Sequence, residues 1–486
     1  MNYSIIRNIL GKIMILVAML MCLPLIVSLI YQEGLTNAIA FIVPIILLLA
    51  IGYLFNVKKA RNTKMLAREG FVIVGLTWFI VSLFGCIPFM ITNTLPNFFD
   101  AFFEMVSGFT TTGASVITDV TKVCHSILFW RSFSHWIGGM GVLVLILAII
   151  PESKDGSAMH ILRAESPGPQ VGKLVSKMQV TSRILYLIYL VLTIVLILLL
   201  WLGPDKDMTL FNSLIYGLGT AGTGGFAVDP LSLELYTPYS QYVISIFMII
   251  FGINFSMFYL ILIGNLKEVF KNEEIKWYFG IIIISLIIVT SAIYPMYNDL
   301  EMSFRKALFQ IASIISTTGY SSANFDTWPI ITHAVIVVLM IFGACAGSTA
   351  GGTKITRVNI LFKSSVNKIK NMVNPRKVEI LSVDGKKVEK SVIEAVQSYF
   401  VVYIAVLIVS TLLISIDNHD LTTNFTASLS CISNIGPGLS KVGPYGSFSI
   451  FSDFSTFILT IVMIAGRLEL FPILVLFSPS TWKKRI

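Results

Sequence analysis

The chain has 486 residues, of which 55% are hydrophobic and only 13% are charged. Soluble globular domains contain roughly 45 to 50% apolar and about 25% charged residues, so this composition excludes an ordinary soluble protein. Lys and Arg outnumber Asp and Glu by 35 to 26, but they lie between long apolar runs and not in one basic patch of the kind that binds nucleic acid. The sequence therefore predicts a helical membrane protein with several spans and no nucleic-acid partner.

Ten apolar runs are long enough to cross a bilayer, which requires about 20 mostly apolar residues per helix. They are predicted at 13–31, 38–56, 71–93, 127–150, 184–203, 239–263, 278–296, 330–360, 392–416 and 455–477. The first run lacks an Ala-x-Ala-like cleavage site and is followed by a second run. It is therefore interpreted as a retained helix and not as a signal peptide.

The basic residues concentrate in the connecting segments 58–68 and 363–390 and at 483–485. These segments all fall on one side of the membrane if ten spans alternate in direction. Because cytoplasmic loops carry the excess of Lys and Arg, this pattern predicts that both termini are cytoplasmic.

Four shorter apolar stretches interrupt the loops on the opposite side. They lie at 100–112, 210–223, 303–318 and 421–435, and each breaks into Gly, Thr or Ser before the next span begins. Apolar stretches of about 10 to 14 residues are too short to cross a membrane and favour re-entrant or core helices. Because the same unit of span, short helix, loop and span recurs, the sequence predicts an internally repeated architecture.

A glycine-containing loop follows each short stretch. The four loops are Thr111-Thr112-Gly113, Thr223-Gly224-Gly225, Thr317-Thr318-Gly319 and Asn434-Ile435-Gly436. Non-helical backbone at membrane depth is tolerated only where protein buries it or where it lines an aqueous cavity. Four such loops therefore indicate a pore in which backbone carbonyls replace the hydration shell of a cation, at the negative C-terminal ends of four short helices. The alternative is that the small residues only allow close helix contacts, and four matched loops make it less favoured.

These repeats define the predicted fold class, an all-α membrane protein with four helix–pore-helix–filter-loop–helix units in a pseudo-fourfold arrangement. Two extra transmembrane helices precede the repeats. The predicted boundaries are 1–70 for the N-terminal helix pair, then 71–183, 184–276, 277–390 and 391–486 for pore repeats 1 to 4.

A second break lies in the eighth predicted span, where small residues run from 343 to 353. The break contains Gly343, Gly347, Gly351 and Gly352 and ends at Lys354. It is not a nucleotide-binding P-loop, because the required Gly-Lys-Ser/Thr order is missing. We interpret it as a flexible gating loop beneath the filter, with a small-residue helix contact as the alternative.

Two charged residues lie within apolar surroundings. Arg467 falls inside the last predicted span, where a cation costs about 2.5 to 3.5 kcal/mol and usually marks an ion path. It is predicted to act as a barrier to cations just inside the filter, with pairing to Glu469 or snorkelling as the alternative. Glu104 in the first short helix either acts electrostatically on the filter or pairs with a neighbouring polar group, and pairing is favoured. His125 and His135 near the first loop are predicted to be structural.

The loops TTTGAS, GTGGF, STTGY and SNIGPGL, in this order, resemble the TrkH-type members of the Trk/Ktr/HKT superfamily of potassium transporters. The resemblance implies a pore built from one chain, with K⁺ held by the twelve loop residues named above and with Arg467 and the 343–353 loop in the pore. It associates a glycine at position 113 with preference for potassium. It further implies a homodimer in the bacterial inner membrane and a cytoplasmic, TrkA-like regulatory subunit that binds nucleotide.

The sequence therefore predicts potassium uptake through a selective, gated pore. The alternative is a symporter that couples K⁺ to H⁺ or Na⁺ through broken helices, which the lack of a convincing acidic pair within the spans disfavours. No HExxH, GxSxG or paired Asp indicates an enzyme, and no Gly-rich dinucleotide motif indicates a cofactor in this chain. The register of the second loop stays open, because Gly219, Gly222, Gly224 and Gly225 offer several alignments.

Overall fold

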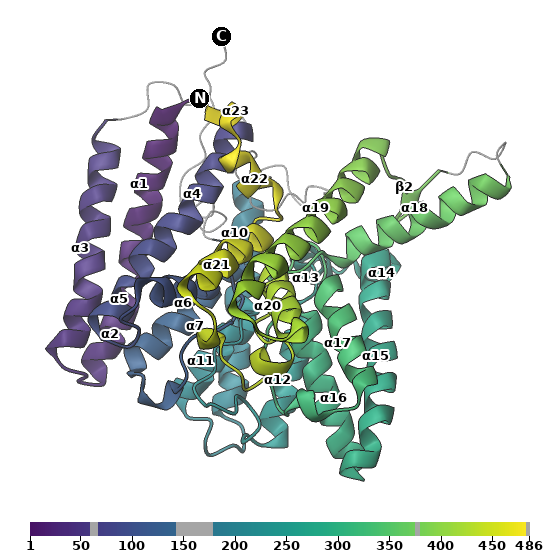
Figure 1. The fold of residues 1–486 in the computed structure, drawn as a ribbon, viewed down its shortest axis with the longest axis horizontal. Helices are drawn as coiled ribbons and strands as arrows, with labels where there is room; N and C mark the ends of the chain where they lie inside the picture. Colours follow the sequence, from purple (N-terminus) through teal and green to yellow (C-terminus); the bar gives the residue numbers. More distant parts are fainter. Residues whose placement is uncertain (59–66, 142–177, 375–379, 483–486) are drawn as a thin grey trace.

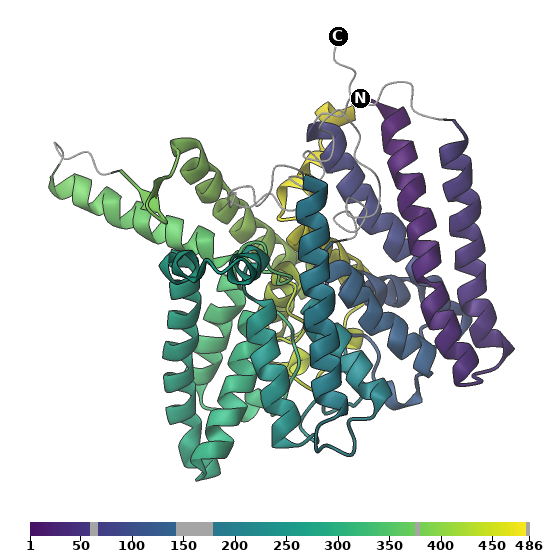
Figure 2. The ribbon, with the colours of Figure 1, turned by 180° about the vertical axis from the view of Figure 1, so that it is seen from behind.

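The computed structural model describes residues 1–58, 67–141, 178–374 and 380–482. These residues form a mainly helical molecule in which the N-terminus and the last helix, α23 (Pro479–Trp482), lie at the same end (Figure 1). One short antiparallel hairpin pairs β1 (Ser382–Val383) with β2 (Lys386–Lys387), beside a helix that projects from the main body (Figures 1 and 2).

Six helical segments in the described residues are long and apolar enough to cross a membrane, or seven if a bent pair counts as one span. The six are Tyr3–Ile30, Leu35–Val57, Arg68–Ile91, Val180–Trp201, Glu273–Tyr297 and Lys390–Asp417. They overlap the first, second, third, fifth, seventh and ninth predicted spans. The prediction of a membrane protein with several apolar helices is confirmed.

The N-terminal elements pack as a unit against the rest of the molecule. They are α1 (Tyr3–Leu20), α2 (Cys22–Ile30) and α3 (Leu35–Val57). A Cβ atom added to Gly52 of α3 would lie 2.9 Å from the carbonyl oxygen of Gly11 in α1, so the two helices approach at their backbones. Small residues allow this close contact between apolar helices.

A short helix forms in each of the four stretches where the sequence predicts one. These helices are α6 (Phe98–Phe109), α11 (Leu210–Gly222), α16 (Leu300–Ile315) and α20 (Leu421–Ser433). Each begins after a side chain that accepts a hydrogen bond from a backbone N–H group of the first turn, and the four capping residues are Asn97, Thr209, Asp299 and Asp420. Asn, Asp and Thr are preferred at this position because they satisfy an otherwise free backbone donor.

The long helices that surround them are α4 (Ala67–Gly85) with α5 (Ile87–Ile91), α7 (His125–Gly139), α10 (Met178–Trp201), α15 (Glu273–Tyr297) and α19 (Lys390–Ile414). The outer loops contain single 3₁₀ turns at Val120–Lys122, Phe325–Thr327, Ser415–Asp417, Ser440–Val442 and Phe448–Ile450. Many apolar side chains on α10, α15 and α19 are exposed, as expected for faces that contact lipid.

The predicted span 239–263 is not one straight helix. The structure has α12 (Pro238–Phe251) and α13 (Phe255–Leu262), which meet at an angle of 92° and are followed by α14 (Leu266–Lys271). The side chain of Asn254 accepts a hydrogen bond from the backbone N–H of Ser256 at 2.9 Å and so begins a new helix at the bend.

Two further predicted spans are interrupted, and one is described only in part. The span 330–360 consists of α17 (Ile330–Phe342), a non-helical segment and the projecting α18 (Ile355–Val373). The span 455–477 divides into α21 (Asp453–Arg467) and α22 (Phe471–Phe477), because Glu469 and Leu470 have positive φ angles of 54° and 67°. Arg467 therefore ends a helix and does not lie within a continuous span. The part of the span 127–150 that begins at 142 lies outside the described residues.

Candidate functional site

The four short helices end in the same backbone motif. A single residue within two positions of the end of each helix adopts the left-handed conformation. These residues are Thr111, Thr223, Thr317 and Asn434, with φ of 56°, 55°, 55° and 54°. The N–H of the next residue then donates to a carbonyl five residues earlier, in the pairs Thr112–Ser107, Gly224–Gly219, Thr318–Ser313 and Ile435–Ser430, at 2.8 to 3.0 Å. This is the Schellman helix ending. The shared motif aligns Thr223-Gly224-Gly225 with the other three loops.

Threonine is an unusual residue at the left-handed position of this motif, where glycine is normal. A β-branched residue with positive φ is a genuine outlier, and the left-handed conformation costs an L-residue roughly 1 to 2 kcal/mol. Local strain of this kind concentrates at functional sites. Its recurrence in three of the four loops indicates that the threonine side chains serve a purpose other than ending the helix.

The four loops form a closed ring in chain order. A Cβ atom added to Gly113 would lie 2.6 Å from the backbone nitrogen of Gly225, and one added to Gly225 would lie 2.6 Å from the carbonyl oxygen of Thr318. The glycine of the third loop, Gly319, meets the carbonyl oxygen of Ile435 in the same way. A Cβ atom on Gly436 would lie 2.8 Å from the carbonyl oxygen of Thr112, so the fourth loop closes on the first.

Buried polar side chains of the loops lie close to the ring. The Nδ2 atom of Asn434 donates to the hydroxyl of Thr112 at 3.0 Å, which joins the fourth and first loops by their side chains. The buried hydroxyl of Thr111 and the Oδ1 atom of Asn434 have no hydrogen-bond partner within the described part of the chain. Nearly all buried polar atoms in proteins find a partner, so these two oxygens are exceptions beside the ring.

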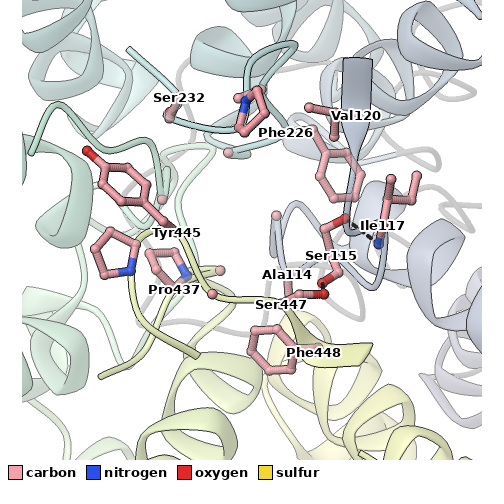
Figure 3. Close-up of a pocket in the computed structure, with 18 of the residues that line it drawn as sticks. Ala114, Ser115, Ile117, Val120, Phe226, Ser232, Pro437, Tyr445, Ser447 and Phe448 are labelled. Carbon is pink, nitrogen blue, oxygen red and sulfur yellow. Dashed lines mark hydrogen bonds between the residues drawn. The ribbon is translucent and has the colours of Figure 1, made fainter. Parts of the chain in front are cut away.

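The ring forms the floor of an outer cavity of about 140 Å³, and all four loop glycines line that cavity. Figure 3 shows this opening with Ser115, Phe226, Pro437 and Tyr445 arranged around it. These residues come from segments that are far apart in the sequence. The outer loops therefore converge on one opening above the ring.

The non-helical segment from 343 to 354 lies against the opposite side of the ring. The backbone N–H of Gly351 donates to the hydroxyl of Thr317 at 2.7 Å, and a Cβ atom on Gly351 would lie 3.0 Å from the Cβ of Asn434. Positive φ angles of 66° to 72° occur at Gly343, Gly347, Gly352 and Lys354. The structure thus brings the predicted gating residues together beneath the third and fourth loops.

Hydrogen bonds to neighbouring helices hold this segment in place. The N–H of Cys345 donates to the carbonyl of Gly252 at 3.1 Å, and the N–H of Phe255 donates to the carbonyl of Gly347 at 3.0 Å, so the segment fills the bend between α12 and α13. Glu274 accepts a bond from the N–H of Ala346 at 2.7 Å. These hydrogen bonds hold the segment in one conformation although it forms no helix of its own.

Arg467 connects this segment to the end of α7. Its guanidinium donates to the carbonyl of Thr349 at 2.9 Å and to the carbonyls of Gly138 and Gly139 at 2.5 and 2.7 Å. Arg467 also lines a second cavity of about 180 Å³, together with Gly351 and Lys354. Glu469, which the sequence offers as a possible partner of Arg467, forms an ion pair with Arg357 of α18.

Sequence reasoning missed Arg131, which lies in α7 and is almost fully buried. Its NH2 atom is 2.7 Å from Oε1 of Glu104 in the first short helix, so Glu104 pairs with a neighbouring group, as favoured. A signal was present, because an arginine inside the predicted span 127–150 is as unusual as Arg467. His135, the other residue noted near the first loop, is buried with Nδ1 2.8 Å from the carbonyl oxygen of Gly108, which fits the predicted structural role.

Comparison with known proteins yields one consistent family. A family model described as TrkH, a cation transport protein, matches residues 37–484. The chain is 33% identical over 492 residues to the Trk system potassium uptake protein TrkH of Escherichia coli (strain K12), with 100% of both chains covered. It is 32% identical to the Trk system potassium uptake protein TrkG of the same strain, with 99% of both covered. The crystal structure of the potassium transporter TrkH from Vibrio parahaemolyticus matches with a TM-score of 0.88 and 29% identity, over 99% of this chain and 100% of that one.

Proposed function

The chain belongs to the TrkH family of Trk potassium uptake transporters, and from this premise we propose that it conducts potassium through a selective, gated pore. The filter of this pore is the ring of four loops. The observation that carries the proposal is the closure of this ring, in which each glycine contacts the backbone of the next loop.

Two physical effects favour a dehydrated cation at this ring. Carbonyl oxygens of the loops replace the water molecules that surround K⁺ in solution. The C-terminal ends of the four short helices carry about half a negative charge each. The residues proposed to hold K⁺ are Thr111, Thr112, Gly113, Thr223, Gly224, Gly225, Thr317, Thr318, Gly319, Asn434, Ile435 and Gly436.

The four-repeat organisation belongs to the same proposal. The repeats comprise 71–183, 184–276, 277–390 and 391–486, after the N-terminal helix pair of 1–70. In support, each of the four ranges contains one short helix with a capped beginning and the Schellman ending described above.

The segment from 343 to 354 and Arg467 together form the proposed gate. In the geometry described here, Gly351 contacts the base of the third loop, and the cationic guanidinium of Arg467 lies at the cavity beneath it. A positive charge at this place opposes cation entry, and conduction therefore requires the segment to move aside.

The proposal extends to assembly and location, in a bacterial inner membrane with both termini in the cytoplasm. We further propose that the chain forms a homodimer. A cytoplasmic TrkA-like subunit that binds nucleotide is proposed to control it. The basic segments at the proposed cytoplasmic face support this orientation. No enzymatic activity is proposed for this chain.

One observation favours a second candidate function, a symporter of K⁺ with H⁺ or Na⁺. Glu274 is buried, lies beside the bend between α12 and α13 and bonds to the gating segment. Broken helices form the coupling-ion sites of many secondary transporters, and buried carboxylates relay protons in pumps and transporters.

Flux into liposomes tests the filter. Each loop glycine is replaced singly by Ser, and K⁺, Na⁺ and Rb⁺ uptake by the purified protein is measured. We expect K⁺ flux to fall by about tenfold or more, because the new side chain must displace the backbone of the next loop. The matched control is Gly280→Ser in α15, where an added Cβ meets no atom within 4 Å. Unchanged K⁺ flux in all four variants would refute the filter.

A further inference from the structure

A buried ion pair lies directly behind the first two loops of the ring. Oε1 of Glu104 is 2.8 Å from Nε of Arg131 and 2.7 Å from its NH2 atom, and the two side chains are 0% and 2% exposed. Removing two charges from water costs so much that buried ion pairs often contribute no net stability compared with apolar residues of similar size. A contribution to the stability of the fold therefore does not explain why a buried ion pair occupies this place.

Glu104 holds the first loop. Its Oε2 atom accepts a hydrogen bond from the backbone N–H of Val116 at 2.9 Å, and its carboxylate also accepts one from the hydroxyl of Ser115 at 3.0 Å. These two residues follow the loop glycine Gly113 closely in the chain. The carbonyl of Ser115 in turn accepts from the N–H of Phe448 at 2.9 Å, which connects this segment to the outer loop before α21.

Arg131 holds the second loop. The Cζ atom of its guanidinium lies 4.1 Å from the ring centroid of Phe226, the residue that follows Gly225. Its NH2 atom also donates to the hydroxyl of Ser115 at 3.1 Å, so the same guanidinium contacts both loops. A cation over the face of an aromatic ring is attracted to it, and more strongly where water is excluded.

The contacts of Phe226 extend to the third loop. Its carbonyl accepts a hydrogen bond from the hydroxyl of Tyr320 at 3.5 Å. Tyr320 follows Gly319 directly and is fully buried. The ion pair and its immediate partners therefore connect the segments that follow the glycines of the first three loops.

From this network we propose that Glu104 and Arg131 are positioning residues that set the ion selectivity of the filter by fixing the first loop against the second. This proposal rests on the filter function proposed above. The pair holds the residues after both loops through hydrogen bonds and a cation–π contact. Because its two charges cancel, it does not repel a cation in the ring. Rigid support from a second layer of residues is what keeps a binding site at its productive geometry.

The decisive variant removes the pair as a whole. The purified single variants Glu104→Leu and Arg131→Met and the double variant Glu104→Leu/Arg131→Met are compared for melting temperature and for the ratio of K⁺ to Na⁺ flux. The single variants leave one buried charge without its partner and are expected to melt several degrees lower. The double variant is expected to melt higher than either single variant, although the N–H of Val116 loses its acceptor. Its K⁺ to Na⁺ flux ratio is expected to stay about tenfold reduced.

The double variant distinguishes a positioning role from a role in stability. If the two residues only compensate each other's charge, the melting temperature and the K⁺ to Na⁺ flux ratio recover together. Recovery of the wild-type flux ratio in the double variant overturns the proposal. If the double variant does not fold, Arg131→Lys decides, because it keeps the charge and loses the paired contacts to Glu104 and Ser115. Wild-type selectivity in Arg131→Lys overturns the proposal in that case.

The matched control is the ion pair Arg305–Glu301 in the first turns of α16, where Nε and Oε1 are 3.0 Å apart and the side chains are 12% and 53% exposed. It lies on a short helix like Glu104 but at the end opposite the loop. The double variant Glu301→Leu/Arg305→Met is expected to keep the wild-type flux ratio. A loss of selectivity as large as that of the Glu104 variants would contradict a role specific to the buried pair.

A second measurement distinguishes failure of this proposal from failure of the filter function. Potassium chloride is expected to raise the melting temperature of the solubilised wild type above its value in sodium chloride, and the Glu104→Leu/Arg131→Met variant is expected to lose this difference. If the wild type shows neither flux nor a potassium-specific shift, both proposals fail. If it shows the shift and the double variant keeps it, only the positioning role fails.

Discussion

The residues that end the four short helices adopt a left-handed conformation that is strained for any residue except glycine. A glycine would end each helix with less strain than Thr111, Thr223 or Thr317. The hydroxyl of Thr317 accepts a bond from the gating segment, and the hydroxyl of Thr111 has no partner among the described residues. The proposed filter predicts that the hydroxyl of Thr111 contacts the permeating ion.

Replacing Thr111 by Gly tests this at the level of one side chain. The variant relieves the left-handed strain, so we expect the free energy of unfolding to rise by about 1 kcal/mol. We also expect weaker K⁺ binding, because one oxygen of the site is lost. Melting temperature and potassium-dependent thermal shift measure the two effects.

The control for this variant is Asn298→Gly at the exposed end of α15, where Asn298 has a φ of 50°. It changes a left-handed residue outside the ring and should leave K⁺ binding as in the wild type. Potassium binding by Thr111→Gly equal to that of the wild type would mean that the hydroxyl does not contact the ion.

At the scale of elements, the breaks in the helices determine where the candidate gate lies. The bend between α12 and α13 accommodates the segment from 343 to 354, and the break between α21 and α22 leaves Arg467 at a helix end. From there its guanidinium reaches carbonyls of two different elements. Continuous helices in these places would not provide such contacts.

Arg467→Ala removes both the positive charge and the bond to Thr349, so we expect K⁺ flux to rise several-fold. Flux into liposomes containing purified protein measures this. Arg7→Ala serves as the control, because Arg7 also donates to a backbone carbonyl, that of Phe55 at 3.1 Å, but lies in the N-terminal helix pair. Flux that stays constant or falls in Arg467→Ala would exclude a barrier at this position.

At the scale of the whole molecule, the ring and the gate connect segments from all four proposed repeats. The first and fourth loops contact each other although Thr112 and Asn434 are 322 residues apart in the chain. The ring therefore closes only when the segments that carry all four loops are packed together. Substitutions that separate the first loop from the fourth are thus expected to affect all four loops together.

A pore and a symporter differ in their response to a proton gradient across the whole molecule. For a pore, we expect K⁺ uptake driven by a membrane potential to be unchanged when an inward proton gradient is imposed. Potassium and pH indicators inside the same liposomes measure both ions. Proton entry in fixed proportion to potassium, abolished by Glu274→Gln, would instead establish the symporter.

Part of the fold and of the candidate site could be predicted from local sequence. The four short helices and the loops that follow them are visible because an apolar stretch too short to cross a membrane ends in Gly, Thr and Ser. Arg467 and the 343–353 segment stand out against apolar surroundings for the same reason. The bend at Asn254 was missed, since a single polar residue and a glycine within an apolar run do not indicate a change of direction.

The sequence by itself determined the class of the protein, because the length and polarity of each apolar run decide whether it can enter a bilayer. It also determined where the four short helices and the 343–353 segment break, since Gly, Thr and Ser act on the backbone next to them. Only the tertiary structure decided that the four loops close into one ring, that Arg467 contacts the end of α7, and that Glu104 pairs with Arg131. These are contacts between residues that are distant in the chain, and their geometry depends on how whole helices pack.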